Sequence, residues 1–362
     1  SGSAFVPEGE SVWELSTTPT VAAKAQEDYE KRTKRTGDVD PTRTTFVFVT
    51  SRRWASKDTW TADRRAEGRW RDVRVLDADD LETWLETAPS VHVWLSGRIG
   101  VFPESGGAQD LDTWFENWSN ATEPRLTPTF LLAGRDEGSQ AIERWRSAPG
   151  EPLAIRSESR DESIAVLASV FTLLPADAAA DAMARAVVVA NAAAWRRLMA
   201  ARVPLILIPT FDVGDETMAA VRAGHAVVIP VGESDSAWDN SIVLPPIGRE
   251  KASDVLKAAG LNDERARELS GIARRSMTAF RRRIGRAASL HVPAWASPAV
   301  ARSILPALFA GGWNEKTGDT VVVGQLAAKS YERFADDLTQ WAHGTDPVVR
   351  NRAGIWYLVS RE

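Results

Sequence analysis

Two residues near the start of the chain have the types and the spacing that phosphodiester hydrolysis needs. Glu14 stands in the apolar-rich stretch Ser11–Leu15, which predicts a short strand. Lys24 follows in Val21–Thr33, a stretch of good helix formers. Cleavage by a metal-bound water requires hard oxygen ligands for the cation and a positive group that stabilises charge on the phosphate. A strand that carries Glu14 beside a helix that carries Lys24 would supply one of each.

The elements that must position these two residues alternate between strand and helix. The nearly continuous apolar run Thr44–Thr50 predicts a strand covered on both faces, and Val73–Leu76 predicts a third strand. Helices are expected from the residue after Ser56 to Glu67, over Leu81–Thr87 and over Val91–Ile99, before the Gly100–Gly107 linker. This order predicts an α/β layer arrangement that ends near residue 100.

A wider set of residues surrounds Glu14 and Lys24. It comprises Val12-Trp13-Glu14-Leu15-Ser16, Lys24-Ala25, Asp28-Tyr29, Arg32, Thr45–Thr50, Arg53-Trp54, Lys57 and Trp60. This set resembles the PD-(D/E)XK, or restriction-endonuclease-like, superfamily, in the form that heads bacterial STAND-type defence proteins. The resemblance implies that Glu14 binds a catalytic Mg²⁺ or Mn²⁺ and that Lys24 assists the attacking water. Ser16 stands where a lysine on the strand is expected, so Lys24 must reach in from the helix.

The resemblance also implies a metal-binding Asp on a hairpin before the Glu14 strand. Only Glu8 and Glu10 are acidic there, and we expect the Asp to lie upstream of Ser1. The residues themselves leave another interpretation open. Lys24, Asp28 and Arg32 stand at i, i+4 and i+8, so they also fit a network of salt bridges on one helix face.

Positive residues mark two candidate faces for DNA on a protein whose formal net charge is −5. The first lies in the Arg-rich segment Lys31–Arg74 and includes Arg32, Arg52, Arg53 and Lys57, of which the last three follow a strand end, where α/β sites form. The second is Lys251–Leu290, which has ten basic and four acidic residues. Each set also fits a solvated face that pairs with acidic neighbours.

Alternating strands and helices continue in the second block of the chain. Strands are expected over Leu153–Arg156, Ala186–Ala190, Pro204–Pro209, His225–Pro230 and Ser241–Leu244. With helices between most of them, this alternation predicts a parallel sheet. A nucleotide-binding sheet carries G-x-x-x-x-G-K-[ST] after its first strand, but Ile155–Ser163 has neither glycine nor lysine and carries three carboxylates that repel phosphate. We therefore expect no ATP.

The last part of the chain predicts a helical segment and a winged helix. Glu250–Arg286 has a helical pattern, and Pro298–Glu362 shows three helices and a hairpin-like Val348–Ser360. The candidate recognition helix, Tyr331–His343, is acidic, so we expect it to pack within the protein rather than bind DNA. Residues Leu126–Glu362 are similar, in a degenerate form, to the NTPase and winged-helix part of the same STAND-type proteins.

Composition limits the chemistry and the location. The 362 residues include no cysteine, which excludes disulfides, Cys-ligated zinc, iron–sulfur clusters and thiol catalysis. The four histidines show no metal-binding spacing. No run of about 18 apolar residues occurs, and the first residues do not form a signal peptide. We expect a soluble, cytoplasmic protein with no membrane partner.

These observations predict an α/β protein in four parts. Residues 1–103 form a restriction-endonuclease-like domain, truncated at its N-terminus, and 104–247 a P-loop-NTPase-like parallel-sheet domain that lacks its phosphate loop. Residues 248–295 form a helical lid and 296–362 a winged helix. The expected function is a metal-dependent DNA endonuclease with a regulatory platform in antiphage defence, triggered by a phage or host protein and able to form a homo-oligomer. The alternative is a catalytically inactive scaffold that binds DNA or protein.

Overall fold

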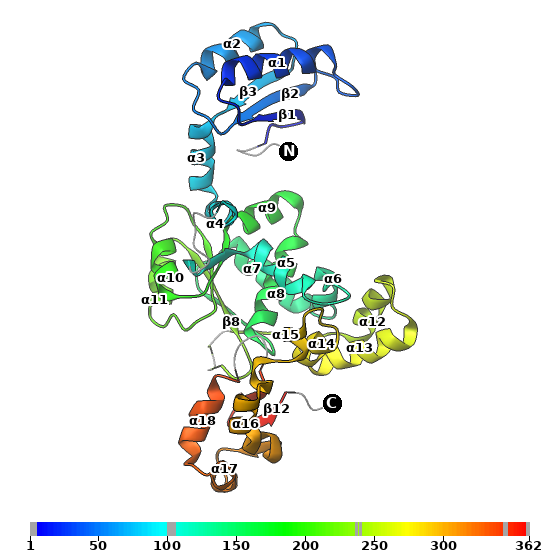
Figure 1. Ribbon diagram of the computed structural model, residues 1–362, viewed down its shortest axis with the longest axis vertical. Coiled ribbons are helices and arrows are strands. Elements are labelled where there is room, and N and C mark those ends of the chain that lie inside the picture. Colours follow the sequence, from blue (N-terminus) through cyan, green and yellow to red (C-terminus); the bar gives the residue numbers. More distant parts are fainter. Residues whose placement is uncertain (1–5, 100–105, 236–237, 239–240, 343–346, 360–362) are drawn as a thin grey trace. The chain divides into compact units, whose positions relative to one another are not determined.

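The fold is a mixed α/β arrangement in which most paired strands are parallel and roughly half of the residues are helical. The computed structural model describes residues 6–99, 106–235, 238, 241–342 and 347–359 (Figure 1). The chain divides into two compact units, Ser1–His92 (unit 1) and Val93–Glu362 (unit 2). Each unit has hydrophobic clusters of its own, which define where its sheet is covered.

Unit 1 is built on a parallel sheet of three strands in the order β1-β2-β3. The strands are β1 (Glu10–Ser16), β2 (Thr44–Thr50) and β3 (Asp72–Leu76). Helices α1 (Val21–Lys34) and α2 (Lys57–Ala66) connect them, because parallel strands need crossover connections. The helix α3 (Ala78–Thr87) follows, and α4 (Pro89–Arg98) contains the boundary between the two units. The order of strands and helices expected from the sequence is confirmed.

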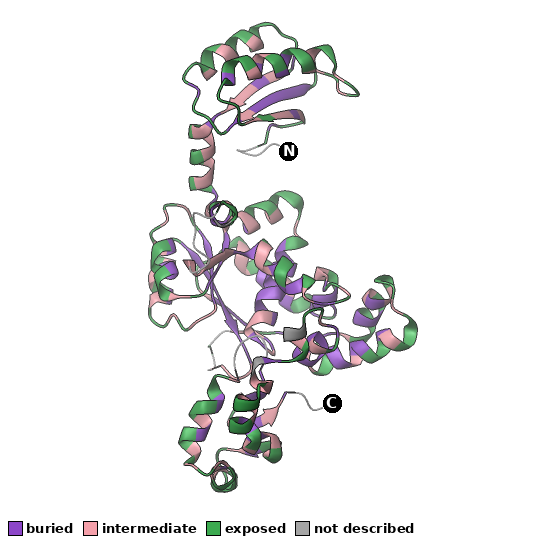
Figure 2. Ribbon diagram, in the orientation of Figure 1, coloured by how far each residue is buried: buried purple, intermediate pink, exposed green. Residues whose placement is uncertain are grey.

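Alternation along the strands decides which face of this sheet forms the core. The face packed against the helices carries Val12, Phe46, Phe48 and Val73. Tyr29 of α1 packs on this face, with its ring edge-on to that of Phe46. Leu15 points to the opposite face and is 74% exposed. Figure 2 colours β2 as buried over most of its length, as expected for a central strand.

Unit 2 contains a six-stranded sheet in the order β4-β6-β7-β8-β5-β9. Its strands are β4 (Ala108–Asp110), β5 (Leu153–Arg156), β6 (Ala186–Val189), β7 (Ile206–Pro209), β8 (Ala226–Val231) and β9 (Ile242–Val243). Paired strands are parallel except β4, which runs antiparallel to β6. The expected parallel sheet is confirmed. The edge strand β4 was not expected, because three residues are too few to show an alternating pattern.

Helices cover both faces of this sheet. On one face lies α8 (Arg160–Thr172), in which every residue from Glu162 to Phe171 is buried. On the other face lie α10 (Ala192–Met199) and α11 (Glu216–Arg222), which bury Trp195 and Ala220 (Figure 1). Four further helices are α5 (Leu111–Asn120), α6 (Pro128–Leu131), α7 (Asp136–Ser147) and α9 (Ala176–Arg185).

Three helices after the sheet share its core. They are α12 (Arg249–Ala258), α13 (Asp263–Arg275) and α14 (Met277–Arg283). Their Leu256, Leu269 and Phe280 belong to the same hydrophobic cluster as Ile155 of β5 and Ile164 of α8. This segment therefore has no separate core. A short helix α15 (Ala288–His291) and a 3₁₀ turn (Ala294–Ala296) follow.

The end of unit 2 combines three helices with an antiparallel sheet. The elements are α16 (Pro298–Ala310), β10 (Gly312–Asn314), α17 (Asp319–Ala327), α18 (Tyr331–Thr339), β11 (Val349–Arg352) and β12 (Ile355–Leu358), with the sheet order β10-β12-β11. Trp313, Phe334 and Trp356 form a separate core, and the two tryptophan rings stack at 5.6 Å. Nowhere in the described part of the chain is a helix long and apolar enough to cross a membrane.

Candidate functional site

Glu14 lies on the helix-covered face of the edge strand β1, two residues before the strand ends. About a third of its side chain is exposed (32%), so solvent reaches the carboxylate. Arg32, which extends from α1, places Nε 3.2 Å from Glu14 Oε1. The Arg32 guanidinium, which we expected to contact DNA, therefore balances the charge of Glu14 in this structure.

Lys24 lies in the first turn of α1 and is bound by acids of its own helix. Its Nζ lies 2.7 Å from Asp28 Oδ1 and 3.5 Å from Glu27 Oε2. The hydrogen bond to Asp28 raises the pKa of Lys24. Within the described residues, no ion pair or hydrogen bond joins Lys24 to Glu14. The structure places the two candidate residues on consecutive elements, and each is bound to a different partner.

Acidic groups that could complete a metal site with Glu14 are sparse. No group of three or more His, Cys, Asp or Glu side chains in the described ranges is arranged to hold a metal ion. Of the acids that precede Glu14, Glu10 accepts a hydrogen bond from the Thr44 hydroxyl at 3.2 Å. A Mg²⁺ or Mn²⁺ here would have the Glu14 carboxylate as a ligand and would depend on water or on further groups for the rest of its shell.

The carboxyl end of the unit 1 sheet holds a charge cluster that our sequence analysis missed. Lys57 Nζ lies 2.7 Å from Asp77 Oδ1 and 2.6 Å from Asp80 Oδ2. Asp77 is 2% exposed and also accepts a hydrogen bond from the backbone N–H of Trp54 at 2.9 Å. Asp77 and Asp80 together form a capping box at the start of α3. The signal in the sequence is an acidic residue directly after a strand and another three positions later.

The electrostatics of this cluster favour a structural role. Burial opposes ionisation of Asp77, but hydrogen bonds from Lys57 and from the backbone N–H groups of Trp54 and Asp80 outweigh it and lower its pKa to about 2. Burial alone would lower the pKa of Lys57. The hydrogen bonds to Asp77 and Asp80 outweigh burial, so the net effect is a raised pKa. Lys57, which we expected to contact DNA, is mostly buried and fully paired.

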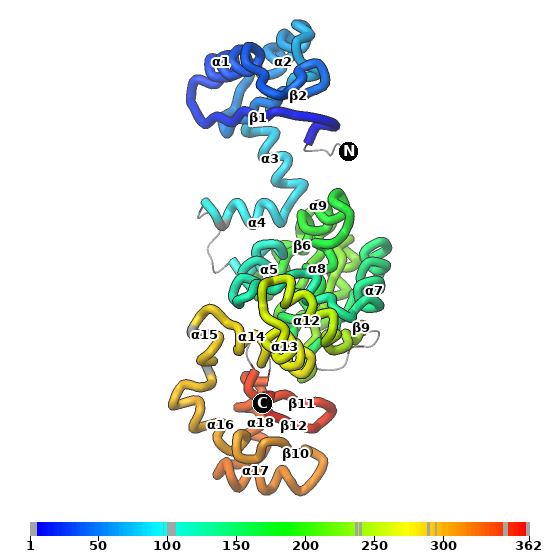
Figure 3. The backbone as a smooth tube through the Cα atoms, turned by 90° about the vertical axis from the view of Figure 1, so that its right-hand side faces the viewer, coloured from blue at the N-terminus to red at the C-terminus, as the bar shows by residue number. Residues whose placement is uncertain are grey.

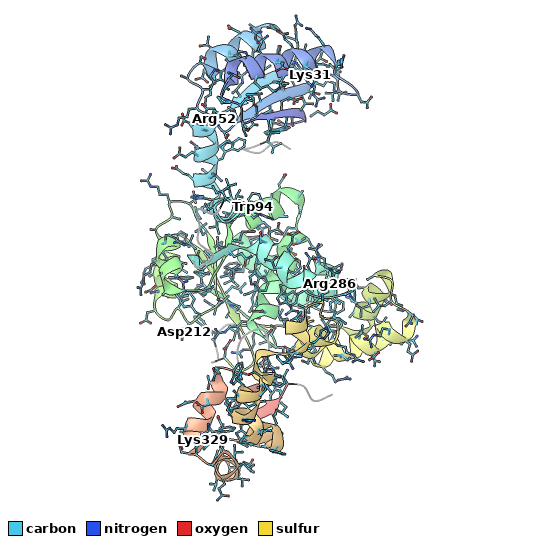
Figure 4. All side chains as sticks on the ribbon, viewed as in Figure 1. Lys31, Arg52, Trp94, Asp212, Arg286 and Lys329 are labelled. Atoms are coloured by element: carbon cyan, nitrogen blue, oxygen red, sulfur yellow. The ribbon has the colours of Figure 1, made fainter. Side chains whose placement is uncertain are left out.

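The loop after β2 keeps two arginines at the surface. Arg52, labelled in Figure 4, donates a hydrogen bond from Nε to the backbone carbonyl of Thr17 at 3.2 Å, which links the loops that follow β1 and β2. Arg53 is 75% exposed and pairs with Asp79 at 2.9 Å. Exposed ion pairs contribute little free energy, so a phosphate can compete for both side chains.

In unit 2, the turn that follows β5 carries a carboxylate with several partners from other elements. Glu158 lies between β5 and α8, and its Oε1 accepts a hydrogen bond from the Ser276 hydroxyl at 2.8 Å. Its Oε2 accepts from the backbone N–H of Met277, the first residue of α14. Arg350 Nη2, from β11, lies 3.6 Å from Oε1. Burial raises the pKa of Glu158, and the charge of Arg350 opposes this rise.

A cavity of about 740 Å³ surrounds Glu158 and is lined by charged side chains. They are Arg135, Arg156, Arg274, Arg275, Arg350 and Arg352, with Glu158, Glu162 and Glu233. The other two glutamates are also engaged. Arg135 binds Glu162 at 2.6 Å, and the Tyr357 hydroxyl donates a hydrogen bond to Glu233. The cavity is therefore lined by both arginines and glutamates, and each of the three glutamates is bound by residues of the protein itself.

The basic segment Lys251–Leu290 is largely paired with acids. Ion pairs link Lys251 to Asp136, Lys257 to Asp254 and Asp263, Arg265 and Arg283 to Glu268, Arg267 to Asp263, and Arg286 to Glu123. Arg281 is buried and lies 4.0 Å from the centre of the Trp118 ring. Most of this segment is thus a face paired with acidic neighbours, and Arg274 stands apart from these ion pairs.

No family model matches this sequence, and no curated protein matches it. An assignment of function rests on the residues, contacts and electrostatics of the chain itself.

Proposed function

We propose that the chain is a metal-dependent DNA endonuclease effector on a regulatory platform that does not hydrolyse nucleotide, of the kind found in bacterial antiphage defence. In this proposal, unit 1 is a restriction-endonuclease-like domain and the unit 2 sheet is a P-loop-NTPase-like domain without its phosphate loop. The helices α12 to α15 form the lid, and the last three helices and three strands form a winged helix. The observation that carries the proposal is the accessible Glu14 carboxylate on a parallel strand that leads into the Lys24 helix.

In this proposal, Glu14 holds Mg²⁺ or Mn²⁺, which supplies an activated water and neutralises charge on the phosphate. Lys24 stabilises the attacking water or the phosphate, and Arg52 and Arg53 hold the DNA backbone. Arg32, which forms an ion pair with Glu14, would control whether the Glu14 carboxylate is free. A DNA phosphate that binds Arg32 in place of Glu14 would leave the Glu14 carboxylate free to hold a metal ion.

The platform part of the proposal is supported by Glu158. A carboxylate in the turn after β5 repels a nucleotide phosphate, and its partners Ser276, Met277 and Arg350 are already engaged. We therefore propose regulation by a phage or host protein, and by self-association, in place of ATP. A cytoplasmic location fits a chain without cysteine.

The test is cleavage of supercoiled plasmid with Mg²⁺, with Mn²⁺ and with EDTA. It uses the chain and, where the gene encodes residues before Ser1, the longer protein. We expect metal-dependent nicking that Glu14→Ala abolishes, because the metal loses its carboxylate. Lys24→Met is expected to slow nicking by about 100-fold, the lower range for a positioned acid–base group.

Glu10→Ala is the matched control. It removes a carboxylate from the same strand, where Glu10 is exposed and its carboxylate accepts a hydrogen bond from Thr44. Glu10→Ala should nick at the rate of the unaltered protein. Equal nicking by Glu14→Ala and the unaltered protein would show that the assignment of Glu14 is wrong.

A second candidate function is a catalytically inactive scaffold that binds DNA or protein. The observation that favours it is that Glu14 forms an ion pair with Arg32 and Lys24 forms one with Asp28, so that each candidate catalytic residue already has a partner of opposite charge. Salt-dependent DNA binding without cleavage at any metal concentration would select this candidate over the nuclease.

A further inference from the structure

Asp28 is a buried acid on the side of α1 that faces the sheet of unit 1. Helix α1 packs beside β1 and β2, as Figure 3 shows. The buried residues of this helix form one face and are Val21, Ala25, Asp28 and Tyr29. The Asp28 side chain is 8% exposed, whereas that of its neighbour Glu27 is 69% exposed. A carboxylate therefore lies on a face where an apolar side chain is expected.

The Asp28 carboxylate depends on Lys24 for its pairing. Burying a carboxylate costs free energy unless it is paired and hydrogen-bonded. Lys24 Nζ donates a hydrogen bond to Asp28 Oδ1 at 2.7 Å. From the part of the chain that the structure describes, the Asp28 side chain receives no other hydrogen bond or ion pair. The position of this buried carboxylate therefore sets the position of the Lys24 ammonium group.

Helix stability does not explain the choice of these two residues. Lys24 lies in the first turn of α1, where the helix dipole is positive and a cation is unfavourable, and that turn contains no acidic residue. The pair also has the less favourable order, because an acid four residues before a lysine stabilises a helix more than the reverse. A buried acid that holds a cation at the start of a helix indicates a role outside the helix.

The pair lies on the side of α1 where the candidate catalytic carboxylate is found. Glu14 is on the helix-covered face of β1, and Asp28 is on the sheet-facing side of α1. An ammonium group has three N–H donors, of which Asp28 accepts one, and Glu27 lies 3.5 Å from Nζ. Because the Lys24 side chain is 32% exposed, a phosphate can reach a remaining donor.

We propose that Asp28 is a positioning residue for DNA cleavage, which holds the Lys24 ammonium group toward a substrate phosphate beside Glu14. Without this bond, the long and flexible Lys24 side chain adopts several rotamers, and the ammonium group is displaced from the reacting phosphate. Asp28 does not touch the substrate and acts through Lys24. The inference rests on the proposed function, because it assigns a role in cleavage.

The test measures metal-dependent plasmid nicking by Asp28→Asn in the unaltered protein and in Lys24→Met. Asparagine keeps the shape of aspartate and removes its charge. We expect Asp28→Asn to lower kcat about ten-fold in the unaltered protein, with KM for the plasmid unchanged. In Lys24→Met it should change kcat by less than about two-fold, because the group through which Asp28 acts is already absent. A purely structural role would lower both rates equally.

Glu27→Gln is the matched control. It removes the other acid near Lys24 from the exposed side of the same helix and should nick at the rate of the unaltered protein. Circular dichroism shows whether each variant is folded. If Asp28→Asn is not folded, Asp28→Glu gives the same comparison in the two backgrounds, because it keeps the charge and moves the carboxylate by one methylene.

Equal nicking by Asp28→Asn and the unaltered protein overturns the inference, and so does an equal loss of rate in both backgrounds. Neither result affects the proposed function, provided that Glu14→Ala does not nick. If the unaltered protein does not nick, or if Glu14→Ala nicks equally well, the proposed function fails and the inference fails with it. The Glu14→Ala variant therefore distinguishes the two failures.

Discussion

The Asp77 carboxylate concentrates more hydrogen bonds than any candidate catalytic group in unit 1. It accepts from Lys57 and from the backbone N–H groups of Trp54, Asp79 and Asp80. Four donors aimed at one buried carboxylate favour its ionised form, which is why its pKa lies near 2. The Asp77 charge therefore fixes the loop after β2 to the start of α3.

This environment predicts a pH dependence for Asp77→Asn. A pKa lowered from 3.8 to about 2 stabilises the folded state by about 2 kcal/mol above pH 4, and this contribution disappears as the pH falls toward 2. The variant should therefore be less stable than the unaltered protein at pH 7 and equally stable near pH 2. Urea unfolding followed by pulsed hydrogen exchange of the β2 and β3 amides measures the difference.

Asp79→Asn is the control for this prediction. Asp79 lies on the same helix, is 59% exposed and pairs with Arg53. Its substitution should change stability by less than about 0.5 kcal/mol at every pH. A pH-independent loss of stability in Asp77→Asn would show that shape, and not charge, is the contribution of Asp77.

At this scale, sequence reasoning found residue types but not partners. Glu14 and Lys24 were identified from their types, and the i, i+4 rule anticipated the Lys24–Asp28 pair. The Glu14–Arg32 pair joins a strand to a helix, and the Lys57–Asp77 pair joins two segments 20 residues apart. Such contacts depend on how elements pack, which local periodicity does not encode.

The turn between β5 and α8 connects two further elements, α14 and β11. The Glu158 carboxylate accepts a hydrogen bond from the backbone N–H at the start of α14 and forms an ion pair with Arg350 of β11. Arg350 also donates a hydrogen bond to the Thr278 hydroxyl at 3.3 Å. Arg350 is 2% exposed, and the Glu158 carboxylate balances its charge. Removing one partner of a buried ion pair leaves the other uncompensated.

Glu158→Ala should therefore destabilise the packing of α14 and β11 by about 3 kcal/mol. The measurement is native-state hydrogen exchange, in which the amides of both elements should exchange faster. Glu137→Ala, at an exposed position of α7, should leave them unchanged. Faster exchange in α14 without any change in β11 would contradict a link through Arg350.

The order and type of the longer elements could be predicted from the sequence, whereas the shortest strands could not. Strands such as Leu153–Arg156 are apolar runs buried on both faces, which is a strong signal. The three-residue strands β4 and β10 are held by pairing with β6 and β12, so no local pattern marks them. The sequence predicted only that the β5–α8 turn does not bind phosphate, because the partners of Glu158 come from residues more than 100 positions away.

At the scale of the molecule, unit 2 joins its last strands to its large sheet by polar contacts. Tyr357 donates to Glu233, the Asn351 backbone N–H donates to the Ser234 hydroxyl at 3.0 Å, and Arg282 donates to the Pro347 carbonyl at 2.8 Å. These contacts link two hydrophobic cores that share no residue. The coupling between the cores therefore depends on a few hydrogen bonds and on the Glu158–Arg350 pair.

This predicts that unit 2 unfolds in one transition and that Glu158→Gln with Tyr357→Phe divides it into two. The first transition should involve residues 296–359, whose core is the smaller. Scanning calorimetry with parallel hydrogen exchange distinguishes the outcomes. A single transition that only moves to lower temperature in the double variant would mean that the two cores are coupled in another way.

The Glu158–Arg350 contact also has a consequence for synthesis. A ribosome completes the β5–α8 turn about 190 residues before it adds Arg350, so at roughly 10 residues per second the Glu158 carboxylate waits about 20 seconds for this partner. During that time, the nascent chain holds a half-satisfied acid where α14 must dock. A premature stop before β11 would leave this acid permanently without its arginine, and the shortened chain would become a substrate for the proteases that remove incompletely folded proteins.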